Sequence, residues 1–206
     1  MAIIHGRTDS GNVQRAMWAC AEAGFAVERT DVGGKFGGNH TPEFLAKNPN
    51  GLVPVLEDGA FVLWESNAII RYVAEVHGGP PLYPADAKAR AIANQWMGWS
   101  NTAMNVPLVP LFVGMVRTAP ADRDAGAIER ARLETARHWA MLDAHLADRT
   151  FVAGDAFSMG DIPLGASAYR WFAMDIERPD HARLRAWYER LAERPAYREH
   201  VMLVLS

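Results

Sequence analysis

Glu65 and Ser66 stand where two hydrophobic patterns meet. Residues 61–64 form an apolar run typical of a short strand, and the apolar positions after Ser66 recur at helical spacing up to Val76. A carboxylate and a hydroxyl therefore lie at the start of a predicted helix, where backbone N–H groups and the positive end of the helix dipole converge. Such a junction suits a bound carboxylate ligand. The alternative is that the pair only caps the helix.

A second feature of the same stretch is Pro54, at the head of the apolar run 53–56. The turn between this run and residues 61–64 contains Asp58-Gly59, which favours a β-hairpin. Pro54 is a candidate for a cis peptide bond, which would expose the backbone of Val53 to an extended peptide instead of another strand. The alternative is an edge strand that begins at a proline.

In this order, the Val53-Pro54 pair, the hairpin and the Glu65-Ser66 pair resemble the glutathione-binding half of the cytosolic glutathione transferases. The resemblance covers nearly the whole chain. It implies that the backbone at Val53-Pro54 contacts the cysteinyl part of glutathione, and that Glu65 and Ser66 hold the γ-glutamyl end. It also implies glutathione as a co-substrate and no metal. The sequence has no cluster of metal-ligating side chains at ligand spacing and no phosphate-binding glycine loop.

Ser10 lies at the start of the first predicted helix, with Thr8 and Asn12 nearby. A hydroxyl or amide at this place can donate a hydrogen bond to a thiolate, and the helix dipole acts in the same direction. Residues 10–16 resemble the serine segment of theta-like transferases, with Gln14 where an arginine is frequent. In nu-like relatives a threonine and an asparagine act in the same loop, so Asn12 is a second candidate. The alternative is that Ser10 only caps the helix.

The resemblance also implies that His40 contacts the glycine carboxylate of glutathione. The residue before Val53 is often lysine in the family, but it is Leu52 here. Because leucine has no charge, a contact from Leu52 to the glycine carboxylate of glutathione is in doubt. We therefore expect this contact from His40, with Lys35 as a weaker candidate.

A small hydrophobic electrophile is the second substrate that the resemblance implies, bound between the two halves of the chain. We expect Arg7 at the mouth of its pocket. Candidates for the apolar lining are Met104, Val106, Trp171 and Phe172, although methionine and tryptophan at helical spacing usually belong to a core.

Composition excludes several classes of partner. Of the 206 residues, 50% are hydrophobic and 22% are charged, and the net charge of −3 offers no basic field for nucleic acid or an anionic membrane. No apolar run is long enough to span a bilayer, and no signal-peptide pattern follows Met1. The single cysteine, Cys20, excludes an intrachain disulfide and lies on the apolar face of its predicted helix, so we expect a buried hydrophobic residue. A cytoplasmic location fits these features.

Two domains are expected. Residues 1–78 alternate strands and helices in the order βαβ then ββα, which predicts a thioredoxin-like domain with a mixed sheet. Residues 79–86 are a Gly- and Pro-containing linker, and residues 87–206 form an all-helical domain. The predicted strands are 2–5, 25–32, 53–56 and 61–64; the predicted helices are 12–23, 42–47, one from 66, 86–116, 125–146, 158–173, 181–194 and 196–203.

Two local signals concern folding within the helical half. Pro107 and Pro110 should kink or break the helix 86–116. Ser158 and Asp161 have the spacing of a capping box, flanked by a hydrophobic staple of Phe157 and Ile162. We therefore expect Asp161 to serve folding and not catalysis.

The function that follows is transfer of glutathione, whose thiolate attacks the electrophile, by a homodimeric enzyme. Glutathione-dependent disulfide reduction, which Asn12 near Thr8 permits, is one alternative. A non-catalytic binding module with the same fold is another, because a fold does not determine a function.

Overall fold

The computed structural model describes residues 1–206 and divides into two units. One contains Met1–Ala85 and Ala196–Leu203, and the other contains Asp86–Pro195 and Val204–Ser206. We expected residues 87–206 to form one helical domain, but the segment Ala196–Leu203 joins the first unit. The reason is a long-range contact: the Tyr197 ring is fully buried, with its centre 4.7 Å from that of Trp18.

The first unit has the mixed sheet that the sequence predicts. Its strands follow the order β2-β1-β3-β4, with β1 and β2 parallel and the other neighbouring pairs antiparallel. This confirms the thioredoxin-like fold. The strands are β1 (Ala2–His5), β2 (Val27–Thr30), β3 (Val55–Asp58) and β4 (Phe61–Trp64); the helices are α1 (Gly11–Glu22), α2 (Pro42–Lys47), α3 (Ser66–Val73) and α9 (Pro195–His200).

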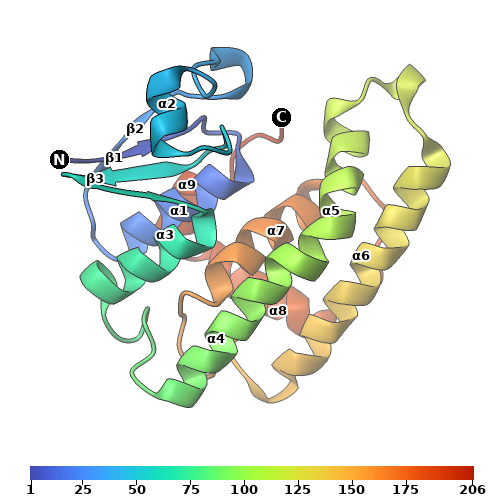
Figure 1. Cartoon of the computed structure of the whole chain (residues 1–206). Coiled ribbons are helices and arrows are strands. Elements are labelled where there is room, and N and C mark those ends of the chain that lie inside the picture. The colour runs from blue at the N-terminus through green and yellow to red at the C-terminus, as the bar shows by residue number, and fades with distance from the viewer. The chain divides into compact units, whose positions relative to one another are not determined.

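Helices cover both faces of this sheet, with α1 and α3 on one face and α2 on the other (Figure 1). Ile4 of β1 and its partner Leu56 of β3 are both fully buried. The next residue of β1, His5, points to the opposite face, as alternation along a strand requires, and its ring meets that of Phe44 of α2 edge-on at 6.5 Å.

His5 also belongs to a polar cluster on the α2 face. Its Nε2 lies 2.8 Å from Glu57 Oε2, and its Nδ1 lies 2.8 Å from the Thr30 hydroxyl. The ammonium group of Lys47, the last residue of α2, lies 2.5 Å from Glu57 Oε1. The hydrogen bonds from Lys47 and His5 hold the pKa of Glu57 below its ordinary value. The cluster ties α2 to the sheet. His5 is the last residue of β1, which has the bounds that the sequence predicts.

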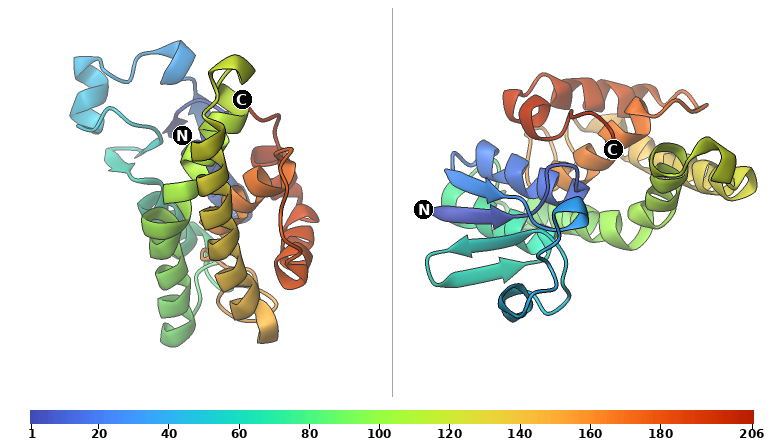
Figure 2. Two further views of the ribbon diagram at one scale, coloured as in Figure 1. Left: turned by 90° about the vertical axis from the view of Figure 1, so that its right-hand side faces the viewer. Right: turned by 90° about the horizontal axis from the view of Figure 1, so that it is seen from above.

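The second unit is helical, as expected, but the prolines of its first long helix do not break it. A π-helical turn, Ser100–Met104, joins α4 to α5, and α5 contains Pro110 and is followed by another π-helical turn, Val113–Arg117. A proline lacks the N–H for a normal helix bond, and wider turns accompany such positions. Figure 2 shows α4 and α5 following one another as one long helical stretch. The helices are α4 (Ala87–Trp99), α5 (Asn105–Phe112), α6 (Ala125–His145), α7 (Asp161–Ala173) and α8 (Ala182–Ala192).

Asp161 is fully buried in this unit and accepts hydrogen bonds from several segments. Its carboxylate accepts hydrogen bonds from the backbone N–H groups of Ser158 and Val152 and from Trp187 Nε1, each at 2.9 Å. The bond to Ser158 is the capping-box contact that the sequence predicts. Helix α7, however, begins at Asp161 and not at Ser158.

No helix of the chain combines the length and the apolar character needed to cross a membrane.

Candidate functional site

The junction between β4 and α3 has a strained backbone. Glu65, which connects Trp64 to Ser66, has φ 74° and ψ 110° and is the single non-glycine residue of the chain with positive φ. Such a conformation costs about 1–3 kcal/mol and persists only where its surroundings impose it. The Glu65 carbonyl accepts the first bonds of α3, from the N–H groups of Ala68 and Ile69 at 2.9 and 3.0 Å. The N–H groups of the first turn of α3 therefore point out of the helix end toward the junction.

This end of α3 opens onto a pocket of about 200 Å³, called the junction pocket below. Of the residues predicted as site residues, it brings together Asn12, Leu52, Val53, Pro54, Glu65 and Ser66. Three further residues complete its lining: Asn48, Asn50 and Trp64. Ser66 is 3% exposed and Trp64 is 42% exposed, so the pocket has a buried polar base and an open aromatic rim. All of these residues belong to the first unit.

Val53 offers its backbone to this pocket. The Val53-Pro54 peptide bond is cis, as the sequence predicts. The ladder of β3 with β4 begins at Val55, which pairs with Trp64, so Val53 lies outside the sheet. Its N–H and carbonyl groups take part in none of the backbone hydrogen bonds between loops and turns. An extended peptide can therefore pair with Val53 as a further strand would.

Asn48 holds the segment before Val53 in place. It is 2% exposed, and its Nδ2 donates to the Leu52 carbonyl at 2.8 Å. Its Oδ1 accepts from both the backbone N–H and the Nδ2 of Asn50, at 3.0 and 2.9 Å. This buried amide thus ties the end of α2 to the backbone that lines the junction pocket.

The start of α1 contributes Asn12. This side chain is exposed and lines the junction pocket. Ser10 is the N-cap residue of α1, is partly buried and lies outside the pocket lining. Its hydroxyl makes no capping hydrogen bond, so the simple alternative of a side-chain cap does not describe it. Both groups stand at the positive end of the α1 dipole.

The comparisons with known proteins agree with this geometry. Residues 5–75 match the family model described as "Glutathione S-transferase, N-terminal domain", and residues 125–190 match "Glutathione S-transferase, C-terminal domain". The chain is 38% identical over 208 residues to Glutathione S-transferase GstB of Escherichia coli, with 100% of both chains covered. The chain belongs to the glutathione S-transferase family.

Solved structures of this family share the fold over the full length. A theta class glutathione S-transferase from Xanthomonas axonopodis pv. citri, solved with glutathione bound, is 48% identical, with a TM-score of 0.96 and coverage of 100% of this chain and 99% of that chain. A delta-class glutathione transferase of Nilaparvata lugens is 28% identical, with a TM-score of 0.86 and coverage of 97% and 92%. The predicted family and fold class are therefore confirmed.

Within this transferase, His40 and Arg7 lie outside the junction pocket. His40 is exposed and packs on Gly51, where an added Cβ would lie 2.7 Å from His40 Nδ1 and φ is +63°. Only glycine suits both conditions. Asn39 Nδ2 donates to the Gly51 carbonyl at 2.7 Å, so the His40 loop is fixed next to Leu52. Arg7 forms an ion pair with Asp9 at 2.8 Å.

The four apolar residues of the helical unit that were predicted to line the second-substrate pocket differ in their exposure to solvent. Met104 and Trp171 have no exposed surface, so both fill the core instead of lining an open pocket, which corrects our expectation for them. The Phe172 ring packs against that of Tyr188 at a tilt of 34°, with ring centres 4.5 Å apart. Phe172 is partly exposed, and Val106, 60% exposed on α5, is the most exposed of the four candidates.

The residues of the pocket lining that the sequence did not reveal are Asn48, Asn50 and Trp64. The Asn-Pro-Asn-Gly segment directly before Leu52 was the available signal, because asparagine side chains often bond to the backbone two residues on. From the sequence, Trp64 was predicted only as a residue of a strand.

No group of three or more His, Cys, Asp and Glu side chains is arranged to hold a metal ion. Burial raises the pKa of the Cys20 thiol to about 12, which makes it unreactive near neutral pH.

Proposed function

We propose that the protein is a glutathione transferase that uses the junction pocket for glutathione. The observation that supports this most is the convergence of the Val53 backbone, the strained Glu65 and the first turn of α3 on one pocket. The 48% identical theta class enzyme is described with glutathione bound. In this proposal Val53 pairs with the cysteinyl backbone, Glu65 and Ser66 hold the γ-glutamyl group, and His40 next to Leu52 contacts the glycine carboxylate.

The reaction joins the glutathione sulfur to an electrophilic carbon. The thiol first loses its proton to solvent. The thiolate then donates an electron pair to the carbon, and the bond to the leaving group breaks with its electrons. Ser10 donates a hydrogen bond to the thiolate, and Asn12 supplies a second contact from the pocket wall. Each unit by which these contacts lower the thiol pKa corresponds to about 1.4 kcal/mol.

The second substrate in this proposal is a small apolar electrophile, the enzyme is a homodimer, and it acts in the cytoplasm. Val106 is 60% exposed on α5, and we assign it to contact with this substrate. Disulfide reduction and a non-catalytic role are not favoured, because the full-length relatives are named as transferases.

Retention on immobilised glutathione, followed by assays with a nitro-substituted aryl halide and with a small disulfide, tests the function. Binding together with conjugation supports a transferase. Disulfide reduction without conjugation would instead favour the reductase, and binding without either reaction would favour the non-catalytic module.

Replacing Ser66 by alanine is expected to weaken glutathione binding by roughly 1–3 kcal/mol, because a buried hydroxyl that pairs with a carboxylate is lost. Titration calorimetry measures the change. Ser167→Ala is the matched control, since this serine of α7 is also 3% exposed and bonds to its own helix at the Pro163 carbonyl. Equal affinity in Ser66→Ala and the wild type would place the γ-glutamyl group elsewhere.

Asn48→Ala is expected to raise the KM for glutathione about tenfold with a smaller effect on kcat. The variant loses the bond to the Leu52 carbonyl, so the Val53 backbone is no longer held in position before glutathione binds. Asn94→Ala, which removes a bond to the Arg90 carbonyl within α4, is the control. Steady-state kinetics on folded protein, with unfolding checked in parallel, give the result. A fall in kcat with unchanged KM would contradict a positioning role.

A further inference from the structure

A second pocket of about 230 Å³ lies beside α1 in the first unit. We name it the α1–α9 pocket. The residues of its lining that matter here are Val13, Gln14, Met17, Arg29, Glu199 and Leu203. None of its lining residues belongs to the junction pocket.

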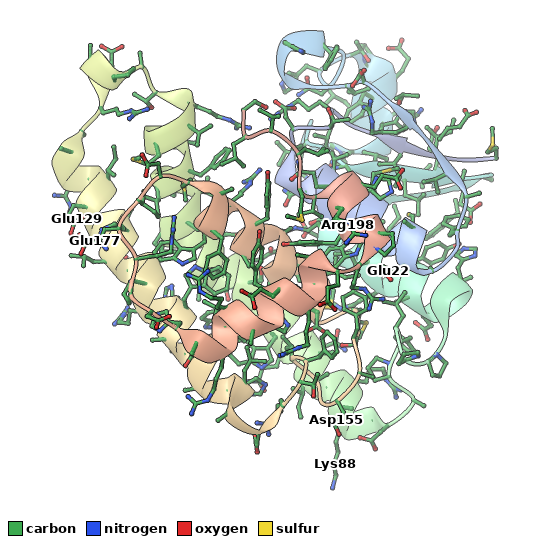
Figure 3. All side chains as sticks on the ribbon, turned by 180° about the vertical axis from the view of Figure 1, so that it is seen from behind. Glu22, Lys88, Glu129, Asp155, Glu177 and Arg198 are labelled. Carbon is green, nitrogen blue, oxygen red and sulfur yellow. The ribbon has the colours of Figure 1, made fainter.

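Its apolar walls come from two elements that are packed together. Val13 and Met17 lie on α1, and Leu203 follows α9. The buried contact between Trp18 and Tyr197 fixes α9 against α1. Figure 3 shows these two helices from behind, with Glu22 labelled on α1 and Arg198 on α9. The walls are therefore formed before any ligand binds.

Arg29 gives the pocket one available cationic edge. Its Nη1 donates to the Gly6 carbonyl at 2.8 Å and to Asp31 Oδ1 at 2.6 Å. These are its two hydrogen bonds, so Nε and Nη2 have no acceptor, and the side chain is 23% exposed. This edge of a guanidinium has the fork geometry that binds both oxygens of a carboxylate.

The other polar residues of the lining are Thr8, Gln14, Glu199 and His200, and two of them restrict what can bind. Gln14 is 8% exposed and donates from Nε2 to the Thr8 carbonyl at 3.0 Å, which leaves its Oε1 as an acceptor without a donor. Glu199 adds a negative charge to the lining, and this charge disfavours a ligand with two carboxylates. The pocket therefore combines an apolar body and the Arg29 cation with the acceptors of Gln14 and Glu199 and the imidazole of His200.

We propose that the α1–α9 pocket binds a small apolar monocarboxylate. The carboxylate pairs with the Nε and Nη2 edge of Arg29, and the apolar part lies between α1 and Leu203. This site does not rest on the transferase proposal, because the two pockets share no residue.

Calorimetric titration with 3-phenylpropionate tests the site in the presence of excess S-hexylglutathione, a glutathione thioether that blocks the junction pocket under the transferase proposal. We expect saturable binding, at least tenfold tighter than that of the neutral analogue 3-phenylpropanamide. Absence of saturable binding, or equal affinity for the acid and the amide, would overturn the proposal. Binding of S-hexylglutathione itself is a separate result that bears on the transferase function.

Two variants locate the site. Arg29→Gln removes the cation, and Leu203→Trp fills the apolar space without touching the Arg29 contacts to Gly6 and Asp31. Each should weaken 3-phenylpropionate binding at least tenfold. Arg137→Gln removes an arginine whose side chain is 73% exposed on α6 and should change nothing. Wild-type affinity for the acid in folded Leu203→Trp would place the ligand elsewhere, even if Arg29→Gln fails to fold.

Discussion

Replacing Asp161 by alanine is expected to lower the free energy of unfolding by at least about 3 kcal/mol, while the protein that remains folded keeps its turnover. Three buried donors, the N–H groups of Val152 and Ser158 and Trp187 Nε1, lose their acceptor in this variant. Each unpaired buried donor costs about 1–3 kcal/mol. Burial raises the pKa of Asp161 to about 6, so the carboxylate form accepts these bonds at pH 7.5, where chemical denaturation should be measured.

Asp155→Ala provides the control for this experiment. Asp155 lies in the same loop region before α7 but is exposed, so its loss should change the free energy of unfolding by no more than about 0.5 kcal/mol. A large fall in turnover at normal stability in Asp161→Ala would show that Asp161 acts in the reaction and not in folding.

Local signals predicted the elements well where short-range chemistry decides the structure. Thr41 caps α2 by accepting a bond from the Phe44 N–H at 3.3 Å, and Pro42 opens that helix, as the sequence indicates. The hairpin is also as predicted, since Asp58 pairs with Phe61 across the turn that contains Gly59. In each case the residues that decide the structure are neighbours in the chain.

Contacts between distant residues could not be predicted in this way. The bond between Asp161 and Trp187 spans 26 residues, and the packing of Tyr197 on Trp18 joins the two ends of the chain. The positive φ of Glu65 was equally hidden, because glutamate has no preference for that conformation and the fold imposes it. The sequence therefore indicated six of the nine residues that line the junction pocket but not the strained backbone at Glu65.

The distinction between local signals and contacts of distant residues also applies to the residues of the candidate site. Val53, Glu65 and Ser66 could be predicted to lie together because two pairs of adjacent residues contain them, and all three line the junction pocket. Trp64 was missed because its exposure depends on β4 being the edge strand of the sheet. Met104 and Trp171 were predicted to line the second-substrate pocket from their residue type alone. Both are fully buried, so they belong to the core.

Ser10→Ala is expected to slow conjugation near neutral pH by about 10- to 100-fold and to raise the pKa of the bound glutathione thiol by about one to two units. A hydrogen bond to a charged acceptor contributes about 1.5–3 kcal/mol, and each pKa unit corresponds to about 1.4 kcal/mol. The Ser10 hydroxyl is available for such a bond because it makes no capping hydrogen bond to the first turn of α1. The pH dependence of kcat/KM and the thiolate absorbance of bound glutathione measure both effects.

Asn12→Ala and Cys20→Ala complete this experiment. Asn12 lines the junction pocket and Ser10 does not, so the comparison of the two variants decides which side chain contacts the sulfur. Cys20 is buried, and its thiol pKa of about 12 predicts that Cys20→Ala leaves the pH profile in place. If Ser10→Ala has no effect and Asn12→Ala abolishes the reaction, the contact to sulfur comes from the first turn of α1 instead of its cap. If Cys20→Ala abolishes turnover, activation of glutathione by Ser10 is wrong, because a buried thiol would then be the reacting group.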